Sequence, residues 1–168
     1  MTDTHGASTT DAAVEDGANP ADPKSARAAQ IVRTHMIAAV AAGVIPIPIL
    51  GAVLLGGVHL RMLSQLARLY DVAFPEQRAN AIIGSLVGVA GTASAASLLR
   101  VVPGVGQVLG VLGGLALPSA STYALGEVFT RHFESGGTFL TFDPDRAKPD
   151  YHKMLTEKAE QSYAGIKP

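Results

Sequence analysis

The chain has 168 residues, a formal net charge of −1 and no cysteine, and only 16% of its residues are charged. That fraction is well below the roughly 25% usual in soluble domains, so the chain is apolar for its size. The near-neutral net charge gives no long-range field to attract nucleic acid. The lack of cysteine excludes disulfides, thiolate nucleophiles and cysteine-based zinc or iron–sulfur centres. One domain is the natural expectation for this length.

The N-terminal segment, residues 1–22, consists mostly of Ala, Thr, Asp, Gly and Pro. This composition buries too little apolar surface to offset the entropy of ordering, which predicts a disordered tail. Its first five residues are acidic and polar, without the basic start and apolar core of a secretory signal. Entry into a membrane is therefore expected to depend on internal apolar segments.

A first pair of helices is predicted on either side of a proline-rich turn. Asp22 can cap a helix that begins at Pro23 and runs to about Val44. The segment 45–48, Ile-Pro-Ile-Pro, must end this helix, and a second helix follows over about residues 49–70. Only about a dozen apolar residues flank the turn on each side, a reach of roughly 18 Å. This hairpin is therefore expected to be re-entrant or interfacial rather than spanning.

A second hairpin is predicted between Ala79 and Gly126, where the only charged side chain is Arg100. Its apolar arms, Ala79–Leu99 and Val105–Leu125, are each about 21 residues long, within the ~17 to 25 that a transmembrane helix needs. The last of these helices is expected to continue to about Phe133. The turns of the two hairpins are assigned to Pro46, Pro48, Pro103 and Gly104.

The polar residues 135–168 form a C-terminal tail in this interpretation, and residues 23–134 form the helical-hairpin membrane domain. Gly136 and Gly137 break the fourth helix. The segment Phe139–Asp143 is predicted to be extended, and Tyr151–Tyr163 to form a short surface helix.

The arginines indicate an orientation. Most of them flank the open ends of the two hairpins, whereas Arg100 lies at a tip. Because cytoplasmic loops carry an excess of Lys and Arg, both termini and the 71–75 connection are predicted to be cytoplasmic, with the Arg100 tip on the other side. A soluble bundle is the alternative, because the segment 91–97 is too small and too polar to insert strongly.

Glycines recur at intervals of four residues on two of the predicted helices. They are Gly84 and Gly88 on the third helix, and Gly106, Gly110 and Gly114 on the fourth. Such strips let helix backbones approach closely in lipid, so we expect them to close helix 3 on helix 4 or to join protomers in a homo-oligomer. Generic small apolar filler is the alternative interpretation.

Four polar side chains are candidates for a role within or beside the membrane. His59 and Arg61 lie near the end of an apolar helix and are interpreted as interfacial anchors. Arg100 is expected in the opposite headgroup layer, and Gln107 could line a polar path or bond a facing helix.

No set of residues typical of catalysis is evident. The five histidines show no pair at i, i+4 spacing with a third ligand, so no metal is predicted. The glycine-rich segment 104–110 lacks the Lys and Ser/Thr of a P-loop, so no nucleotide cofactor is predicted. Every Asp lies outside the apolar core, and an enzyme acting alone is not expected.

Several short motifs resemble a known bacterial family, the YcjF/GTPase-associated domain of unknown function. They are Ile45-Pro46-Ile47-Pro48, His59-Leu60-Arg61-Met62-Leu63, Leu69-Tyr70, Val102-Pro103-Gly104-Val105-Gly106 and Thr122-Tyr123-Ala124-Leu125-Gly126. The similarity covers about residues 29–133. Members of that family are membrane proteins or C-terminal partners of Era-like GTPase domains, so the resemblance implies helical hairpins and a GTPase-linked membrane role without catalytic residues. This chain has no room for a GTPase domain in its tail, so such a link would act in trans.

These observations predict an all-α, mostly membrane-embedded protein of two helical hairpins with wet termini. Its predicted role is a non-enzymatic anchor or assembly element in the bacterial inner membrane, contacting lipid and a cytoplasmic GTPase or ATPase. Two alternatives stay open: a membrane-permeating or lipid-remodelling hairpin protein that forms oligomers, and a soluble bundle that binds an apolar ligand.

Overall fold

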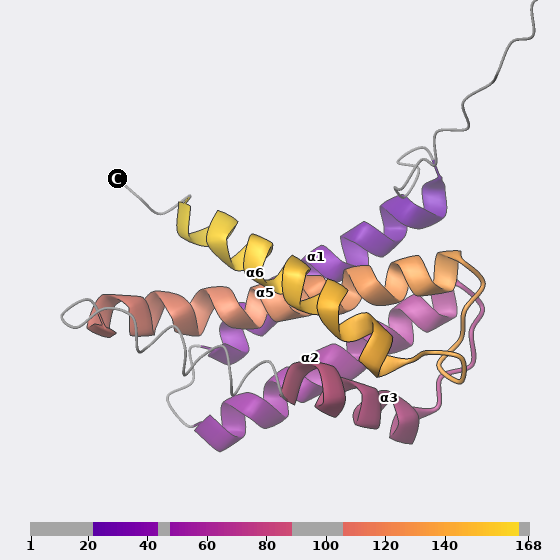
Figure 1. Ribbon diagram of the computed structural model, residues 1–168, viewed down its shortest axis with the longest axis horizontal. Coiled ribbons are helices and arrows are strands. Elements are labelled where there is room, and N and C mark those ends of the chain that lie inside the picture. Colours follow the sequence, from indigo (N-terminus) through magenta and orange to yellow (C-terminus); the bar gives the residue numbers. More distant parts are fainter. Residues whose placement is uncertain (1–21, 44–47, 89–105, 165–168) are drawn as a thin grey trace, which may run out of the picture.

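The computed structural model describes residues 22–43, 48–88 and 106–164. Within these ranges all regular secondary structure is helical, which confirms the predicted all-α fold (Figure 1). The predicted disordered tail, apart from Asp22, lies outside the described residues. So do three predicted turn residues and the predicted tip: Pro46, Pro103, Gly104 and Arg100.

The first two helices form the predicted antiparallel pair. Helix α1 spans Pro23–Gly43 and α2 spans Pro48–Leu69, and they run side by side in opposite directions (Figure 1). The Oδ1 atom of Asp22 accepts a hydrogen bond of 2.9 Å from the backbone N–H of Lys24, so Asp22 caps α1 as expected. Pro48, predicted as a turn residue, is the first residue of α2, where a missing N–H costs nothing.

A short third helix follows the 71–75 connection. Helix α3 spans Glu76–Ile83 and continues into a π-helical turn, η1, at Gly84–Gly88. Among the described residues α3 packs against α2, and η1 packs against the last helix of the chain. The predicted closure of this helix on the fourth stays a prediction, because residues 89–105 lie outside the described residues.

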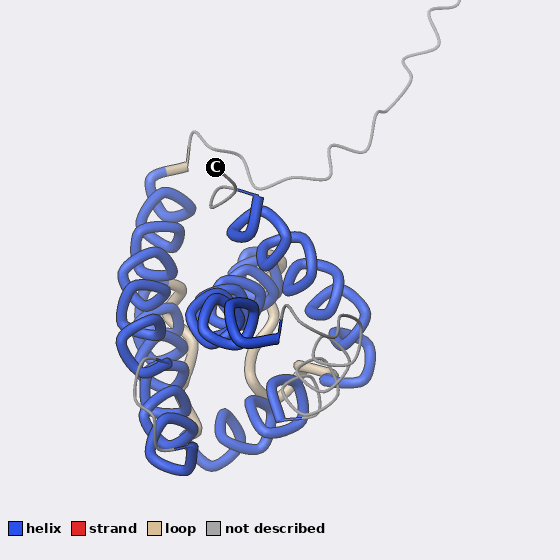
Figure 2. Tube along the Cα trace, turned by 90° about the vertical axis from the view of Figure 1, so that its left-hand side faces the viewer, coloured by secondary structure: helices blue, strands red, loops and turns tan. Residues whose placement is uncertain are grey.

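The long helix α5, Gly106–Glu134, is the centre of the bundle. It contacts α1, α2 and α6, and in the end-on view of Figure 2 the other helices surround it. Pro118 lies inside this helix and cannot donate a backbone hydrogen bond. The helix ends just before Gly136, which adopts a positive φ of 79°, so the predicted glycine break is confirmed.

The C-terminal segment differs from the prediction in two respects. Residues 137–143 form a turn rather than an extended piece, because Phe139 and Phe142 must both point into the core. Helix α6 spans Pro144–Ala164 and so begins seven residues before the predicted start. The carboxylate of Asp143 accepts a hydrogen bond of 3.0 Å from the backbone N–H of Asp145 and caps this longer helix.

The helices alternate in direction, so the bundle has two distinct ends (Figure 1). One end, the polar end, holds the 70–75 and 135–143 connections together with the start of α1. The opposite end holds the end of α1 and the starts of α2 and α5. The buried core between them is centred on Leu63, Leu66, Leu86, Leu125 and Phe129.

Candidate functional site

The end of the bundle opposite the polar end exposes large apolar side chains. We define the apolar end as residues 36–43 of α1 and 48–58 of α2. Ile37 is 73% exposed and Val53 is 66% exposed, and Leu50 and Leu54 are also exposed. Between Arg33 and Arg61 the sequence has no Asp, Glu, Lys or Arg. A charge-free cluster of exposed aliphatic side chains is typical of a membrane or protein contact.

Helix α2 is exposed in its first half and buried in its second. Its segment Leu50–Leu69 is the one helix among the described residues that is long and apolar enough to cross a membrane, by length and composition alone. Core helices of soluble proteins have the same properties. Met62, Leu63 and Leu66 are fully buried against the other helices, so only the first half of α2 presents an apolar surface outward.

His59 lies at the junction of these two halves, and its position corrects the predicted role as an interfacial anchor. The side chain is fully buried, and its Nε2 atom is 3.0 Å from Oγ1 of Thr122 on α5. The Thr122 hydroxyl donates to the Pro118 carbonyl over 2.7 Å, so its oxygen accepts the hydrogen bond from the His59 Nε2–H. The residue faces α5 because α2 turns this side toward the core.

This environment keeps the imidazole neutral. Burial, reinforced by the nearby His35, lowers the pKa of His59 to about 4. Its Nδ1 atom is buried without a hydrogen-bond partner among the described residues. A buried neutral base with one satisfied nitrogen is a structural element of the helix packing, and it costs stability when it is protonated.

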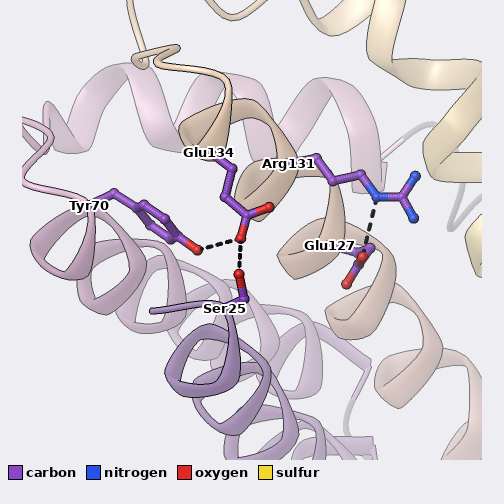
Figure 3. Close-up of polar contacts among 5 residues, drawn as sticks. All are labelled: Ser25, Tyr70, Glu127, Arg131 and Glu134. Atoms are coloured by element: carbon purple, nitrogen blue, oxygen red, sulfur yellow. Dashed lines mark hydrogen bonds and ion pairs between the residues drawn. The ribbon is translucent and has the colours of Figure 1, made fainter. Parts of the chain in front are cut away.

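A second polar cluster, at the polar end, was not evident from the sequence. Figure 3 shows Glu134, at the end of α5, receiving hydrogen bonds from Tyr70 and Ser25. The two hydroxyls lie 2.9 and 2.7 Å from the same carboxylate oxygen. Burial, and then the bond to Glu134, raise the pKa of Tyr70. This cluster ties the start of α1 and the end of α2 to the end of α5, far from the apolar end.

The glycines of the two predicted strips lie on η1 and at the start of α5. A Cβ atom added at Gly84 would meet no heavy atom of the described residues within 4 Å, apart from those of its own helix backbone and chain neighbours. Gly106, Gly110, Gly114 and Gln107 lie in the first turns of α5, whose side-chain surroundings are outside the described residues. The close approach of helices that the structure does describe involves Gly126, where a Cβ atom would lie 2.5 Å from Cγ2 of Val32 on α1.

Arg61 is exposed on α2, as expected for a residue that flanks an apolar segment. Among residues 22–43, 48–88 and 106–164, no three His, Asp or Glu side chains gather in a way that could hold a metal ion.

Comparison with known proteins identifies a relative. The chain is 34% identical over 145 residues to magnetosome membrane protein 22 of Magnetospirillum gryphiswaldense, an alignment that covers 83% of this chain and 74% of the relative. The chain belongs to the family of magnetosome membrane protein 22. It is therefore a member of a bacterial family of membrane-associated proteins, as the apolar end also suggests.

Two further comparisons gave no match. No family model matches the chain, and no solved structure matches it. The resemblance to the YcjF/GTPase-associated family therefore stays a prediction.

Proposed function

We propose that this protein is a non-enzymatic anchor or assembly element that inserts its apolar end into the bacterial inner membrane and holds a partner at the cytoplasmic surface. The observation that carries the proposal is the exposure of Ile37, Leu50, Val53 and Leu54 at one end of the bundle. The membrane location in the name of the 34% identical relative supports it.

The length of the apolar end limits the depth of insertion. Residues 36–43 of α1 and 48–58 of α2 extend over roughly 12 and 16 Å. This is about half of the ~30 Å hydrocarbon core of a bilayer. The α1–α2 hairpin is thus suited to entering one leaflet, in agreement with the re-entrant or interfacial position expected from its sequence.

The charge on helix α6 favours an aqueous environment for the polar end. It carries eight charged side chains and lies along α5, with Tyr151, Leu155 and Ala159 buried against the bundle. Lys158 also places its ammonium group 4.8 Å from the centre of the Tyr123 ring on α5. A helix with this charge is incompatible with a lipid environment around the second half of α5. Both termini are accordingly proposed to be cytoplasmic.

A cytoplasmic GTPase or ATPase acting in trans is the proposed partner. The support is the resemblance to the YcjF/GTPase-associated family, whose members accompany Era-like GTPase domains. Affinity capture of the tagged full-length protein from detergent-solubilised membranes tests this. Recovery of a GTPase or ATPase in stoichiometric amount is expected, and consistent recovery of neither would contradict the partner.

Two matched substitutions test the insertion. Ile37 is 73% exposed at the apolar end, and Leu140 is 72% exposed at the polar end. Ile37→Glu is expected to release much of the protein from membranes during an alkaline carbonate wash, because a buried carboxylate is costly in hydrocarbon. Leu140→Glu should leave the protein in the membrane pellet. Equal behaviour of the two variants, or release of the unmodified protein, would overturn insertion by this end.

A further inference from the structure

A groove of about 570 Å³ runs between α1 and α2 on the outer side of the hairpin. Its polar lining comes from both helices: Arg27, Gln30 and Thr34 on α1, and Arg61 and Gln65 on α2. The α1 residues are spaced by three and four positions and therefore lie on one face of that helix. The α2 residues are spaced by four and face them. We call this the α1–α2 groove.

The α1–α2 groove carries positive charge without compensation. Arg27 and Arg61 are both exposed. In the described part of the chain neither guanidinium makes an ion pair or a hydrogen bond, since the ion pairs there involve Lys24, Arg131, Arg146 and Lys148. None of the described residues that line the groove is Asp or Glu. Two guanidinium groups beside the side-chain amides of Gln30 and Gln65 match an anion with several acceptor oxygens.

One wall of the same groove is apolar and leads toward the apolar end. Ile31, Ala38 and Val58 line it. Ala38 follows the exposed Ile37, and Val58 is the last residue of the apolar end on α2. Arg61 lies one helical turn beyond Val58, so it occupies the level of the lipid headgroups when the apolar end is in the hydrocarbon.

We propose that the α1–α2 groove binds the headgroup phosphate of an anionic glycerophospholipid. The inference rests on the proposed insertion of the apolar end. Arg61 binds the phosphate through its two-pronged guanidinium, and the side-chain amide of Gln65, one turn further along α2, is available to donate beside it. The glycerol backbone and upper acyl chain then lie on the apolar wall at Ala38 and Val58. The lipid would act as a specific ligand at the α1–α2 interface.

His35 is a further polar residue of the groove. It also lines the groove, and its Nδ1 is 2.8 Å from the Ile31 carbonyl, which fixes the ring against α1. With Nδ1–H donating to that carbonyl, Nε2 is the remaining nitrogen of the ring. Among the described residues, the polar part of the groove lining therefore contains no acidic side chain.

Flotation of the purified full-length protein with vesicles tests the inference. One vesicle type contains phosphatidylcholine alone, and the other contains phosphatidylcholine mixed with phosphatidylglycerol. Binding to phosphatidylcholine alone reports insertion of the apolar end, and the increase on adding phosphatidylglycerol reports the groove. We expect binding to both, with at least about a tenfold gain from the anionic lipid.

Three variants separate a specific site from general attraction to a negative surface. Arg33 is exposed at the same level on α1 and does not line the groove, so Arg33→Gln is the matched control. A single basic residue near an anionic surface accounts for about a fivefold effect. Arg61→Gln is expected to remove nearly all of the gain in binding that phosphatidylglycerol gives. Arg33→Gln is expected to weaken binding to the mixed vesicles by about fivefold or less. Arg61→Lys should bind with a strength between those of wild type and Arg61→Gln. Circular dichroism verifies that all three are folded.

The outcomes are distinct. Equal losses in Arg61→Gln and Arg33→Gln, or wild-type binding that ignores phosphatidylglycerol, overturn the headgroup site while leaving insertion intact. Absence of binding to either vesicle overturns insertion and the groove together. Soluble glycerol phosphate is expected not to compete, because it lacks the acyl chain that reaches the apolar wall. Full competition would show that the groove binds a free phosphate ester instead.

Discussion

The Nε2 atom of His59 lies 3.0 Å from Oγ1 of Thr122, in the interior of the bundle. The pair joins α2 to α5 one turn after Pro118, where α5 lacks a backbone donor. The carbonyl of Pro118 accepts the Thr122 hydroxyl, so one chain of hydrogen bonds connects the two helices. The junction between the apolar end and the core therefore contains a buried polar contact whose imidazole is neutral.

Stability should consequently fall in mild acid. The unfolded chain binds a proton at His59 below its ordinary pKa of 6.5, whereas the folded protein binds it only near pH 4. The contribution of His59 to the free energy of unfolding is thus fully present above pH 6.5 and decreases as the pH falls from 6.5 to about 4. The total loss over this range is up to about 3 kcal/mol. Chemical unfolding in mild detergent at several pH values measures it. His59→Gln should flatten the profile, whereas His152→Gln, at a half-buried position on α6, should not. Identical profiles for wild type and His59→Gln would contradict this account.

Two threonines of α5 provide a matched test of the hydrogen bond. Thr122→Val leaves His59 without a partner, and we expect it to cost about 1–3 kcal/mol of unfolding free energy. Thr130 is also buried, but its hydroxyl has no hydrogen-bond partner among the described residues. Thr130→Val should therefore be neutral or stabilising when the thermal unfolding of the two variants is compared with that of wild type. A similar cost for both would mean that the His59–Thr122 bond has no particular importance.

The packing of α1 on α5 depends on Gly126. A methyl group there would approach Cγ2 of Val32 to 2.5 Å, so Gly126→Ala should destabilise the protein by about 1–3 kcal/mol through overpacking. Val32→Ala in the same chain should recover part of the loss, because it removes the clashing methyl groups. Gly84→Ala is the control, since a Cβ atom there meets nothing within 4 Å. Gly84→Ala should be neutral or slightly stabilising. If the double variant Gly126→Ala/Val32→Ala were no more stable than Gly126→Ala alone, the predicted clash would be contradicted.

The sequence was sufficient to predict the first two helices but not how the helices pack against one another. Prolines and capping residues act locally, so the boundaries of α1 and α2 could be predicted within a residue or so. The packing of α3 on α2 depends on which apolar faces meet, and periodicity alone does not encode that choice. The contact at Gly126 was missed for the same reason: its neighbour Val32 is distant in sequence.

The two polar clusters illustrate the same limit. His59 follows an apolar run and precedes Arg61, a pattern that suggests the membrane interface, yet the face of α2 that carries it is turned toward α5. Glu134 has no local signal at all, because its partners Ser25 and Tyr70 lie 109 and 64 residues away in the chain. By contrast, the lack of charged residues between Arg33 and Arg61 is visible in the sequence, and this stretch of α1 and α2 contains the apolar end.

The C-terminal segment packs against the bundle, and the contact between two aromatic rings provides a test of its contribution to stability. The ring of Phe142 stacks on Phe129 of α5 with centroids 4.5 Å apart and an interplanar angle of 9°. Phe142→Ala is expected to cost about 3–5 kcal/mol, as for other buried rings. Leu140→Ala, two residues away and exposed, should stay within about 0.5 kcal/mol of wild type. Unfolding followed by circular dichroism compares them. If residues 135–168 were only a polar tail, the two variants would be equally stable, and α6 would have no part in keeping the second half of α5 away from lipid.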